Sequence, residues 1–196
     1  MLVRFFNHGK VKKGFATRSG GGGDVQSYLL LEGNHKTKPR EGARLIYGDD
    51  AVTTEIINGI KNSKIYTSGV LSFAPEESIT DTQKIEIIES FEANLFPGMT
   101  RGEYSGYWVE HVDKDRQELH FVFADIHLPT GRSLTVYYHH KDLDLVDSWK
   151  DLINFDYGLA DPNDANRQRV YRLKGYEYAH KKMHEKQIFA EQNSAS

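Results

Sequence analysis

Two strand-like runs, over 104–112 and 118–128, constrain the fold of this 196-residue chain more than any other feature. Aromatic, aliphatic and β-branched residues recur through both runs, and a short polar segment around 113–116 separates them. Consecutive strands joined by a short turn pair as an antiparallel hairpin. The sequence therefore predicts such a hairpin near the centre of the fold.

The side chains of the second run alternate in character. Leu119, Phe121 and Phe123 are apolar and fall on one face of the strand, which we assign to the core. Glu118 and His120 fall on the opposite face. A polar pair there indicates a face that is open or lines a cleft.

Hydrophobic spacing and turn residues predict the other elements. Asp24 and Asp50 are the expected N-caps of two helices, and Thr80 with Gln83 forms a capping box that starts a third. Further strands are expected over 2–6, 43–47, 65–74 and 133–138. Helices are expected over 25–32, 50–62, 80–96, 142–155 and 163–187.

Helices mixed with hairpin-forming strands favour an α+β fold, with a largely antiparallel central sheet flanked by helices. In the helix over 142–155, Leu145, Trp149 and Leu152 recur at helical spacing, and we expect them to face the core. We expect one domain over 1–187, followed by a polar, disordered tail over 188–196.

The composition excludes several classes of protein. The chain has no cysteine, which excludes disulfide scaffolds, thiol nucleophiles and cysteine-based zinc sites. No apolar run approaches the ~20 residues of a membrane span, and the N-terminus carries no secretory signal. We therefore expect a protein without membrane insertion, and the absence of cysteine is compatible with a reducing cytoplasm.

The net charge of −3 hides a segregation of charge along the chain. Residues 1–20 hold five bases and no acid, and residues 166–186 hold seven bases and two acids, so the middle of the chain is acidic. Local positive potential attracts a polyanion such as a nucleic acid whatever the net charge is. Alternatively, these bases are simply solvated.

The densest cluster of potential metal ligands lies in the predicted hairpin, at His111, Asp113, Glu118 and His120. An antiparallel neighbour brings His111 opposite the other strand's polar pair, so two imidazoles and one carboxylate can converge. Such nitrogen and oxygen ligands suit Mg²⁺, Mn²⁺, Zn²⁺ or Fe²⁺. Asp113 is able to hold an imidazole through its second nitrogen. Alternatively, these are ordinary polar residues of a half-exposed sheet.

The same hairpin resembles a motif of a known enzyme family. Residues 107–114 (YWVEHVDK) and 118–122 (ELHFV) resemble the third motif of plasmid mobilisation relaxases, which belong to the HUH endonucleases. The resemblance is to the MobA-like relaxases of colicin-type plasmids, whose triad reads His, Glu, Asn. Here His111 and Glu118 match, and His120 replaces the Asn, which keeps a good metal ligand at that position.

Three further segments resemble motifs of this family in the right order. Residues 24–30 (DVQSYLL) resemble the first motif, a tyrosine just before two leucines on a short helix. Residues 64–74 (KIYTSGVLSFA) resemble the second, whose Ser-Phe pair lies near the DNA path. Residues 157–163 (YGLADPN) resemble a run of the same branch, so the resemblance covers most of residues 1–165.

This resemblance implies a site- and strand-specific, metal-dependent DNA relaxase that nicks single-stranded DNA at a plasmid transfer origin. Tyr28 would be the nucleophile that forms a 5′-phosphotyrosyl intermediate, and Asp113 would orient an imidazole. The resemblance also implies a bacterial cytoplasmic protein with relaxosome accessory proteins as partners and Mg²⁺ or Mn²⁺ as the metal ion. The implied metal ligands are His111, Glu118 and His120, and the implied DNA contacts are Lys10, Lys12, Lys13 and Ser72.

Two other classes of function stay open at this point. His111 and Asp113, with a distant histidine such as His180, would form the 2-His-1-carboxylate site of a non-haem Fe(II) oxygenase, which usually has a β-rich double-sheet barrel. A sheet with aromatic residues could instead bind single-stranded nucleic acid without cleaving it, and would then need neither Tyr28 nor a metal. A rolling-circle replication initiator of the same superfamily is a near neighbour in mechanism.

Overall fold

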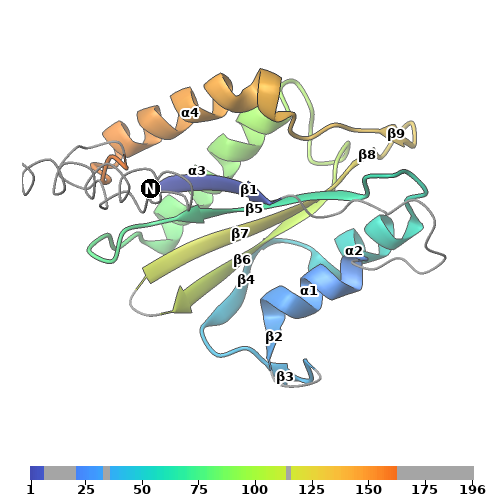
Figure 1. Cartoon of the computed structure of the whole chain (residues 1–196), viewed down its shortest axis with the longest axis horizontal. Helices are drawn as coiled ribbons and strands as arrows, with labels where there is room; N and C mark the ends of the chain where they lie inside the picture. The colour runs from blue at the N-terminus through green and yellow to red at the C-terminus, as the bar shows by residue number, and fades with distance from the viewer. Residues whose placement is uncertain (7–20, 33–35, 114–115, 163–196) are drawn as a thin grey trace, which may run out of the picture. The chain divides into compact units, whose positions relative to one another are not determined.

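Five antiparallel strands form the central sheet (Figure 1). They are β1 (Leu2–Phe6), β4 (Ala43–Gly48), β5 (Tyr66–Ser72), β6 (Gly106–Asp113) and β7 (Arg116–Ala124). Their order across the sheet is β1-β5-β7-β6-β4, so the predicted hairpin β6–β7 lies inside the sheet. The predicted α+β class with an antiparallel central sheet is confirmed.

The computed structural model describes residues 1–6, 21–32, 36–113 and 116–162. All of them except Pro162 belong to one compact unit, Met1–Asp161. The helix expected over 163–187 and the tail expected over 188–196 lie outside the described residues. The boundary of the domain at residue 187 therefore stays a prediction.

Helices cover both faces of the sheet (Figure 1). They are α1 (Gly22–Leu30), α2 (Asp50–Gly59), α3 (Asp81–Leu95) and α4 (His139–Asp156). α3 and α4 pack on one face, and α1 and α2 pack on the other. None of the helices in the described ranges is both long and apolar enough to cross a membrane.

Two small two-stranded sheets lie beside the central one. They are β2 (Leu31–Glu32) with β3 (Lys38–Pro39), and β8 (Ile126–His127) with β9 (Arg132–Ser133).

Each face of the central sheet has its own hydrophobic core. The core under α3 and α4 is aromatic: the ring centroid of Phe91 lies 5.2 Å from that of Phe121 and 5.7 Å from that of Trp108. The core under α1 and α2 is largely aliphatic and includes Leu29 and Ile57. Residues of β7 contribute to both cores, because successive side chains of a strand point to opposite faces.

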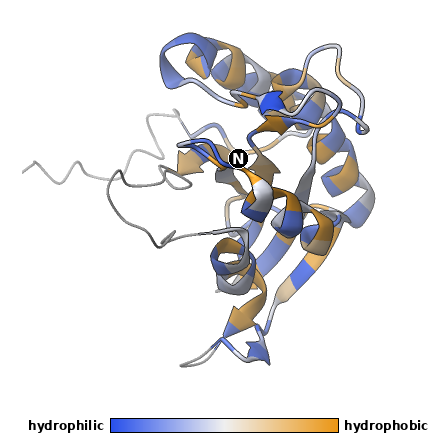
Figure 2. Cartoon of the chain, turned by 90° about the vertical axis from the view of Figure 1, so that its right-hand side faces the viewer, coloured by the Kyte–Doolittle hydropathy of each residue, from blue (hydrophilic) through white to orange (hydrophobic). Residues whose placement is uncertain are grey.

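The predicted alternation along β7 is confirmed. Leu119, Phe121 and Phe123 are fully buried in the aromatic core, and Glu118 and His120 lie on the other face. Figure 2 shows that hydrophobic and hydrophilic residues are mixed along the helices and strands. Since α1 and α2 cover the second face, His120 lines a cleft there and does not lie on an open sheet.

Two predicted helix starts can be compared at α2 and α3. The capping box of Thr80 and Gln83 is confirmed at the start of α3. At α2 the N-cap is Asp49 and not Asp50: the Asp49 carboxylate accepts a hydrogen bond from Val52 N at 2.9 Å. The glycine that ends β4 has a positive φ and turns the chain one residue earlier than the sequence pattern indicated.

The prediction of Asp24 as the N-cap of α1 is wrong. The helix begins at Gly22, and Asp24 lies within its first turn. A side chain from α2 replaces the local cap, because Asn58 Oδ1 accepts the Gly22 N–H at 3.0 Å. A Cβ atom at Gly22 would approach Thr54 O to 2.8 Å, so glycine permits this close contact between the two helices.

The predicted inward face of α4 is partly wrong. Trp149 is buried as expected, but Leu145 and Leu152 are 50% and 57% exposed. Val146 and Ile153 occupy the core instead. Leu145 with Leu152, and Val146 with Ile153, both have helical spacing around Trp149. Packing against α3, where the Trp149 indole N–H donates to a serine hydroxyl, decides which pair faces the core.

The strand predicted over 133–138 is also wrong. Pairing with β8 ends at Ser133, and residues 134–138 form no strand. Packing of side chains holds this segment instead: the ring of Tyr137 stacks on Phe5 of β1, with centroids 3.7 Å apart and planes 4° apart. Aromatic residues favour strands in general, but here they fill a gap between β1 and α4.

Candidate active site

Three of the predicted site residues lie together on the β6–β7 hairpin. His111 is directly opposite Glu118 in the register of the two strands. The ring centroids of His111 and His120 are 4.4 Å apart, and Glu118 Oε2 lies 3.3 Å from His120 Nε2. The hairpin thus brings two imidazoles and one carboxylate to one place, while their role as metal ligands stays a prediction.

His120 is the most unusual member of this group. It is only 8% exposed, and neither of its ring nitrogens has a hydrogen-bond partner. Its contact with Glu118 has the distance of an ion pair but not the orientation of a hydrogen bond. Burial, aided by the neighbouring His111, lowers the pKa of His120 to about 4. At neutral pH the ring is therefore uncharged and has a lone pair to offer.

His111 connects the hairpin to α1. Its Nε2 lies 2.7 Å from the main-chain oxygen of Leu29. A carbonyl oxygen only accepts hydrogen bonds, so Nε2 carries the proton and the lone pair of the neutral ring is on Nδ1. Metal-binding histidines commonly have this arrangement, with one nitrogen on a carbonyl group and the other on the ion.

Glu118 is ionised and held from two sides. Its Oε1 accepts a hydrogen bond from Ser72 Oγ at 2.8 Å and forms an ion pair with Arg116 Nη2 at 2.7 Å. Burial acts to raise the pKa of Glu118, but the Ser72 hydrogen bond and the Arg116 charge outweigh it and hold the pKa below its usual range. Ser72, which the family resemblance implies to contact DNA, orients this carboxylate.

The donor set fits a divalent metal ion. Two imidazoles and an ionised carboxylate are ligands that Mn²⁺, Zn²⁺ and Fe²⁺ accept. The unpartnered nitrogens of His120 supply a buried polar group that needs a partner. Within the part of the chain that the structure describes, no three such side chains already stand at metal-binding distances. Glu118 instead engages Ser72 through a hydrogen bond and Arg116 through an ion pair.

Tyr28 lies in the same cleft as His120. The tyrosine is on α1, one residue before Leu29, and its side chain is 60% exposed. Tyr28 and His120 both line a pocket of about 360 Å³ between α1 and the sheet, together with Asp24. The structure thus brings the predicted nucleophile and one predicted metal ligand into one cavity.

Two bases border this cleft that the sequence analysis did not single out. Lys36 Nζ lies 5.4 Å from the ring centroid of Tyr28. Arg40 Nη1 lies 3.5 Å from the Tyr28 carbonyl oxygen, and its charge acts on His120. Nothing in their sequence context marked them, because the turn between α1 and β4 decides their position.

Arg116 was also missed, although a signal for it existed. The alternation that places Glu118 and His120 on one face extends two residues back to Arg116. Four other predicted site residues are not placed. Lys10, Lys12 and Lys13 lie outside the described residues, and of Asp113 the structure describes only the backbone, at the end of β6.

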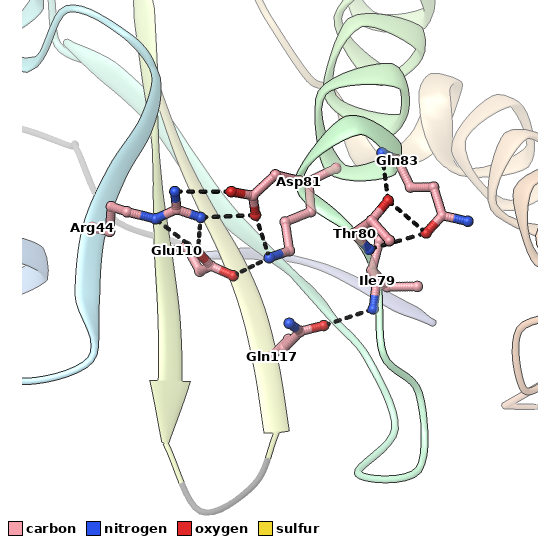
Figure 3. Close-up of polar contacts among 8 residues, drawn as sticks. Arg44, Ile79, Thr80, Asp81, Gln83, Glu110 and Gln117 are labelled. Carbon is pink, nitrogen blue, oxygen red and sulfur yellow. Dashed lines mark hydrogen bonds and ion pairs between the residues drawn. The ribbon is translucent and has the colours of Figure 1, made fainter.

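On the opposite face of the sheet, residues at the start of α3 and just before it form an ion pair and a hydrogen bond with the hairpin (Figure 3). Glu110 lies 2.5 Å from Lys84 Nζ and 2.6 Å from Arg44 Nη2. The side-chain oxygen of Gln117 accepts the N–H of Ile79 at 3.0 Å. Glu110 and Gln117 each immediately precede a residue of the candidate site, so these contacts fix the strand ends that present it.

The fold and this hairpin define a class of protein. Residues 43–159 match the family model of the nuclease domain of MobA/VirD2-like relaxases. The match covers more than half of the chain and includes His111, Glu118 and His120, so the chain belongs to this relaxase family. Tyr28 precedes the matched residues. The described sheet, with helices on both faces, is not the barrel expected of an Fe(II) oxygenase.

Named relatives agree with the family. Over 175 residues, 89% of this chain and 78% of the relative, the sequence is 41% identical to "Cryptic plasmid protein C" of Neisseria gonorrhoeae. Over 173 residues, 88% of this chain, it is 39% identical to "DNA relaxase MbeA" of Escherichia coli, of which it spans 31%. No solved structure matches the chain significantly. The predicted resemblance to plasmid relaxases, DNA-nicking enzymes, is confirmed.

Proposed function

We propose that this relaxase nicks single-stranded DNA at a plasmid transfer origin, with Tyr28 as the nucleophile, and so initiates mobilisation of the plasmid. One observation carries the assignment of the site: Tyr28 lines the same pocket as His120, whose buried nitrogens have no hydrogen-bond partner. The family relationship supports the class of reaction, and the shared pocket supports the residues.

The reaction is a transesterification at phosphorus. The phenol oxygen of Tyr28 attacks the scissile phosphate, forms a 5′-phosphotyrosyl bond and breaks the bond to the 3′-oxygen, which leaves as a free 3′-OH after taking a proton. The phosphodiester is exchanged and not hydrolysed, so the strand can be rejoined. A phenol has a pKa of about 10 and must lose its proton to react well. Asp24 and His120 line the pocket and can accept that proton.

His111, Glu118 and His120 would hold the metal ion, Mg²⁺ or Mn²⁺, which would supply charge neutralisation at the phosphate. Asp113 would orient an imidazole of the group. Lys36 and Arg40, at the rim of the pocket, attract the phosphate electrostatically, and Ser72 sets the direction of the Glu118 carboxylate. The predicted DNA contacts at Lys10, Lys12 and Lys13 belong to this proposal as well.

The wider setting follows from the same proposal. A plasmid relaxase works in the bacterial cytoplasm on the strand that is transferred, together with accessory proteins of the relaxosome. The nicking domain extends over 1–187 in this proposal, and residues 188–196 form a polar tail.

A covalent-trapping experiment tests the nucleophile. The protein is incubated with labelled single-stranded DNA from the transfer origin of its plasmid and with Mn²⁺, then separated under denaturing conditions. We expect a protein–DNA adduct in the wild type and in Tyr47→Phe, which removes an exposed hydroxyl remote from the pocket. The adduct should be absent in Tyr28→Phe and with EDTA.

Two outcomes contradict the proposal in different ways. An adduct that persists in Tyr28→Phe assigns the reaction to another tyrosine. Binding of the DNA without any adduct would favour the second function considered above, a single-stranded nucleic-acid-binding module without catalysis.

A further inference from the structure

A second pocket lies at the edge of the sheet, on the far side of β1 from the site described above. Its volume is about 710 Å³, within the roughly 300–1,000 Å³ of typical ligand sites. Arg4 and Phe6 of β1 form one wall, and residues 137–140 at the start of α4 form the other. No role in the nicking reaction falls to these residues.

We propose that this pocket is a subsite for unpaired bases of the same DNA strand, flanking the nucleotide at Tyr28. The proposal rests on the proposed function, because it takes single-stranded DNA as the ligand. Four consecutive aromatic rings, Tyr-Tyr-His-His over 137–140, provide the stacking surface.

Contacts of Tyr137 support the stacking surface. Tyr137 stacks on Phe5, and its hydroxyl lies 3.0 Å from His139 Nδ1. The next ring, Tyr138, is 49% exposed, and its centroid lies 5.5 Å from that of the exposed His140. Tyr137 and His139 thus form an ordered support, and the neighbouring rings of Tyr138 and His140 are exposed to solvent, as stacking on bases requires.

The charges of the pocket suit a nucleic acid more than a basic peptide. The guanidinium of Arg4 lies 5.7 Å from the ring centroid of Phe6, and no described carboxylate pairs with it. The one acid in the lining, Asp147, is neutralised by Lys150 at 2.8 Å. Arg4 can thus contact a phosphate while the rings stack on bases.

Phe6 connects the two pockets. It lines both the cavity that contains Tyr28 and His120 and the cavity beside α4. β1 is an edge strand that pairs with β5, so the two pockets meet at Phe6 of this strand. This continuity distinguishes the pocket from an isolated surface hollow.

Binding of oligonucleotides of two lengths tests the subsite. Fluorescence anisotropy with EDTA present, so that no nicking occurs, would compare labelled oligo-dT of about 5 and about 14 nucleotides, within the footprints of single-stranded DNA-binding folds. In the wild type the longer strand should bind more tightly. Tyr138→Ala should weaken binding of the longer strand roughly tenfold and leave the shorter one unchanged.

Two further variants make the result specific. Tyr138→Phe retains the ring and should retain the affinity for the longer strand. Phe155→Ala removes a different exposed ring, which lies on α4 outside the pocket and is 85% exposed, and should change neither affinity. The proposal is overturned if the wild type gains nothing from the longer strand, if Tyr138→Ala keeps the gain, or if Phe155→Ala loses it equally.

Failure of this proposal is distinguishable from failure of the proposed function. A Tyr28-dependent adduct together with a length effect that ignores Tyr138 would overturn the subsite alone. A length effect that depends on Tyr138, with no adduct at Tyr28, would overturn the nicking mechanism and retain the subsite.

Discussion

The hydroxyl of Ser72 orients the carboxylate of Glu118, a candidate metal ligand. The Ser72 Oγ hydrogen bond fixes one oxygen of the carboxylate, and Glu118 Oε2 is left facing His120. Ser72→Ala should reduce the apparent affinity for Mn²⁺ about 10- to 100-fold, as loss of a hydrogen bond behind a ligand does. Titration of Mn²⁺ by calorimetry would measure it.

The control for this prediction is Ser148→Ala, which removes a hydroxyl bonded to a carbonyl oxygen within α4. The affinity for Mn²⁺ should be unchanged there. Equal affinities in the wild type and in Ser72→Ala would mean that the carboxylate is not a ligand or does not need this hydrogen bond.

His120 by itself should make the stability of the fold depend on pH. The folded pKa of His120 is about 4, below its ordinary value of 6.5, so the unfolded chain binds a proton first as the pH falls. Its contribution is present above pH 6.5 and is lost progressively down to pH 4. The full loss is on the order of 3 kcal/mol.

Urea denaturation at pH 7 and pH 5 would measure this loss. Buried Glu92 and Asp125 act in the opposite direction, because burial raises the pKa of each carboxyl and acid then favours the fold. Comparison with His120→Asn isolates the histidine: the variant should lose less stability between the two pH values. A parallel loss in both proteins would assign the acid sensitivity to other groups.

At the scale of elements, α3 and the β6–β7 hairpin are joined by a buried ion pair. Burial acts to raise the pKa of Glu110, but hydrogen bonds from Lys84 and Arg44 outweigh it and keep the carboxylate ionised. Lys84→Ala leaves that buried charge with one partner, and should lower the free energy of unfolding by about 3 kcal/mol. Urea denaturation at neutral pH measures the change.

Lys150→Ala is the matched control for that variant. Lys150 is another buried lysine on a helix, but its partners Asp147 and Asp151 are exposed. Their charges remain in water after the substitution, so the ion pairs should account for less than about 1 kcal/mol. Similar losses in the two variants would show that packing of the lysine stem, and not the buried charge, stabilises α3.

The sequence predicted the elements well where periodicity and turns agree. The hairpin, its face alternation and the capping box at Thr80 are all present. It failed where contacts between elements decide. The α1 start depends on Asn58 of another helix, and the inward face of α4 depends on packing against α3 around Trp149. Neither contact has a signature in the local sequence.

The candidate site also has parts that the sequence could predict and parts that it could not. The meeting of His111 with Glu118 follows from hairpin register, so it was predictable from spacing alone. The roles of Arg40 and Lys36 at the cleft were not, because they depend on how the chain returns from α1 to the sheet. The placement of Tyr28 beside His120 required the family resemblance, since 92 residues separate the two in the sequence.

At the scale of the whole molecule, binding of a metal ion should raise the free energy of unfolding. A ligand at 100 times its Kd stabilises the folded state by about 2.7 kcal/mol. We therefore expect Mn²⁺ to raise the melting temperature of the wild type, and EDTA to reverse the increase. Thermal unfolding followed by circular dichroism would measure it.

Glu118→Ala should abolish this shift, and Glu55→Ala, which removes an exposed carboxylate on α2, should preserve it. A shift of equal size in both variants would indicate that the ion binds elsewhere on the acidic part of the chain.

The hydrogen bond between His111 and the carbonyl oxygen of Leu29 has a consequence for the order of events during synthesis. It joins residues 82 positions apart, so α1 acquires this contact with the sheet only after β6 has been made. Tyr28 emerges from the ribosome early and must wait for the hairpin before its pocket exists. If Tyr28 is the nucleophile as proposed, a nascent chain carries it long before its pocket with His120 can form.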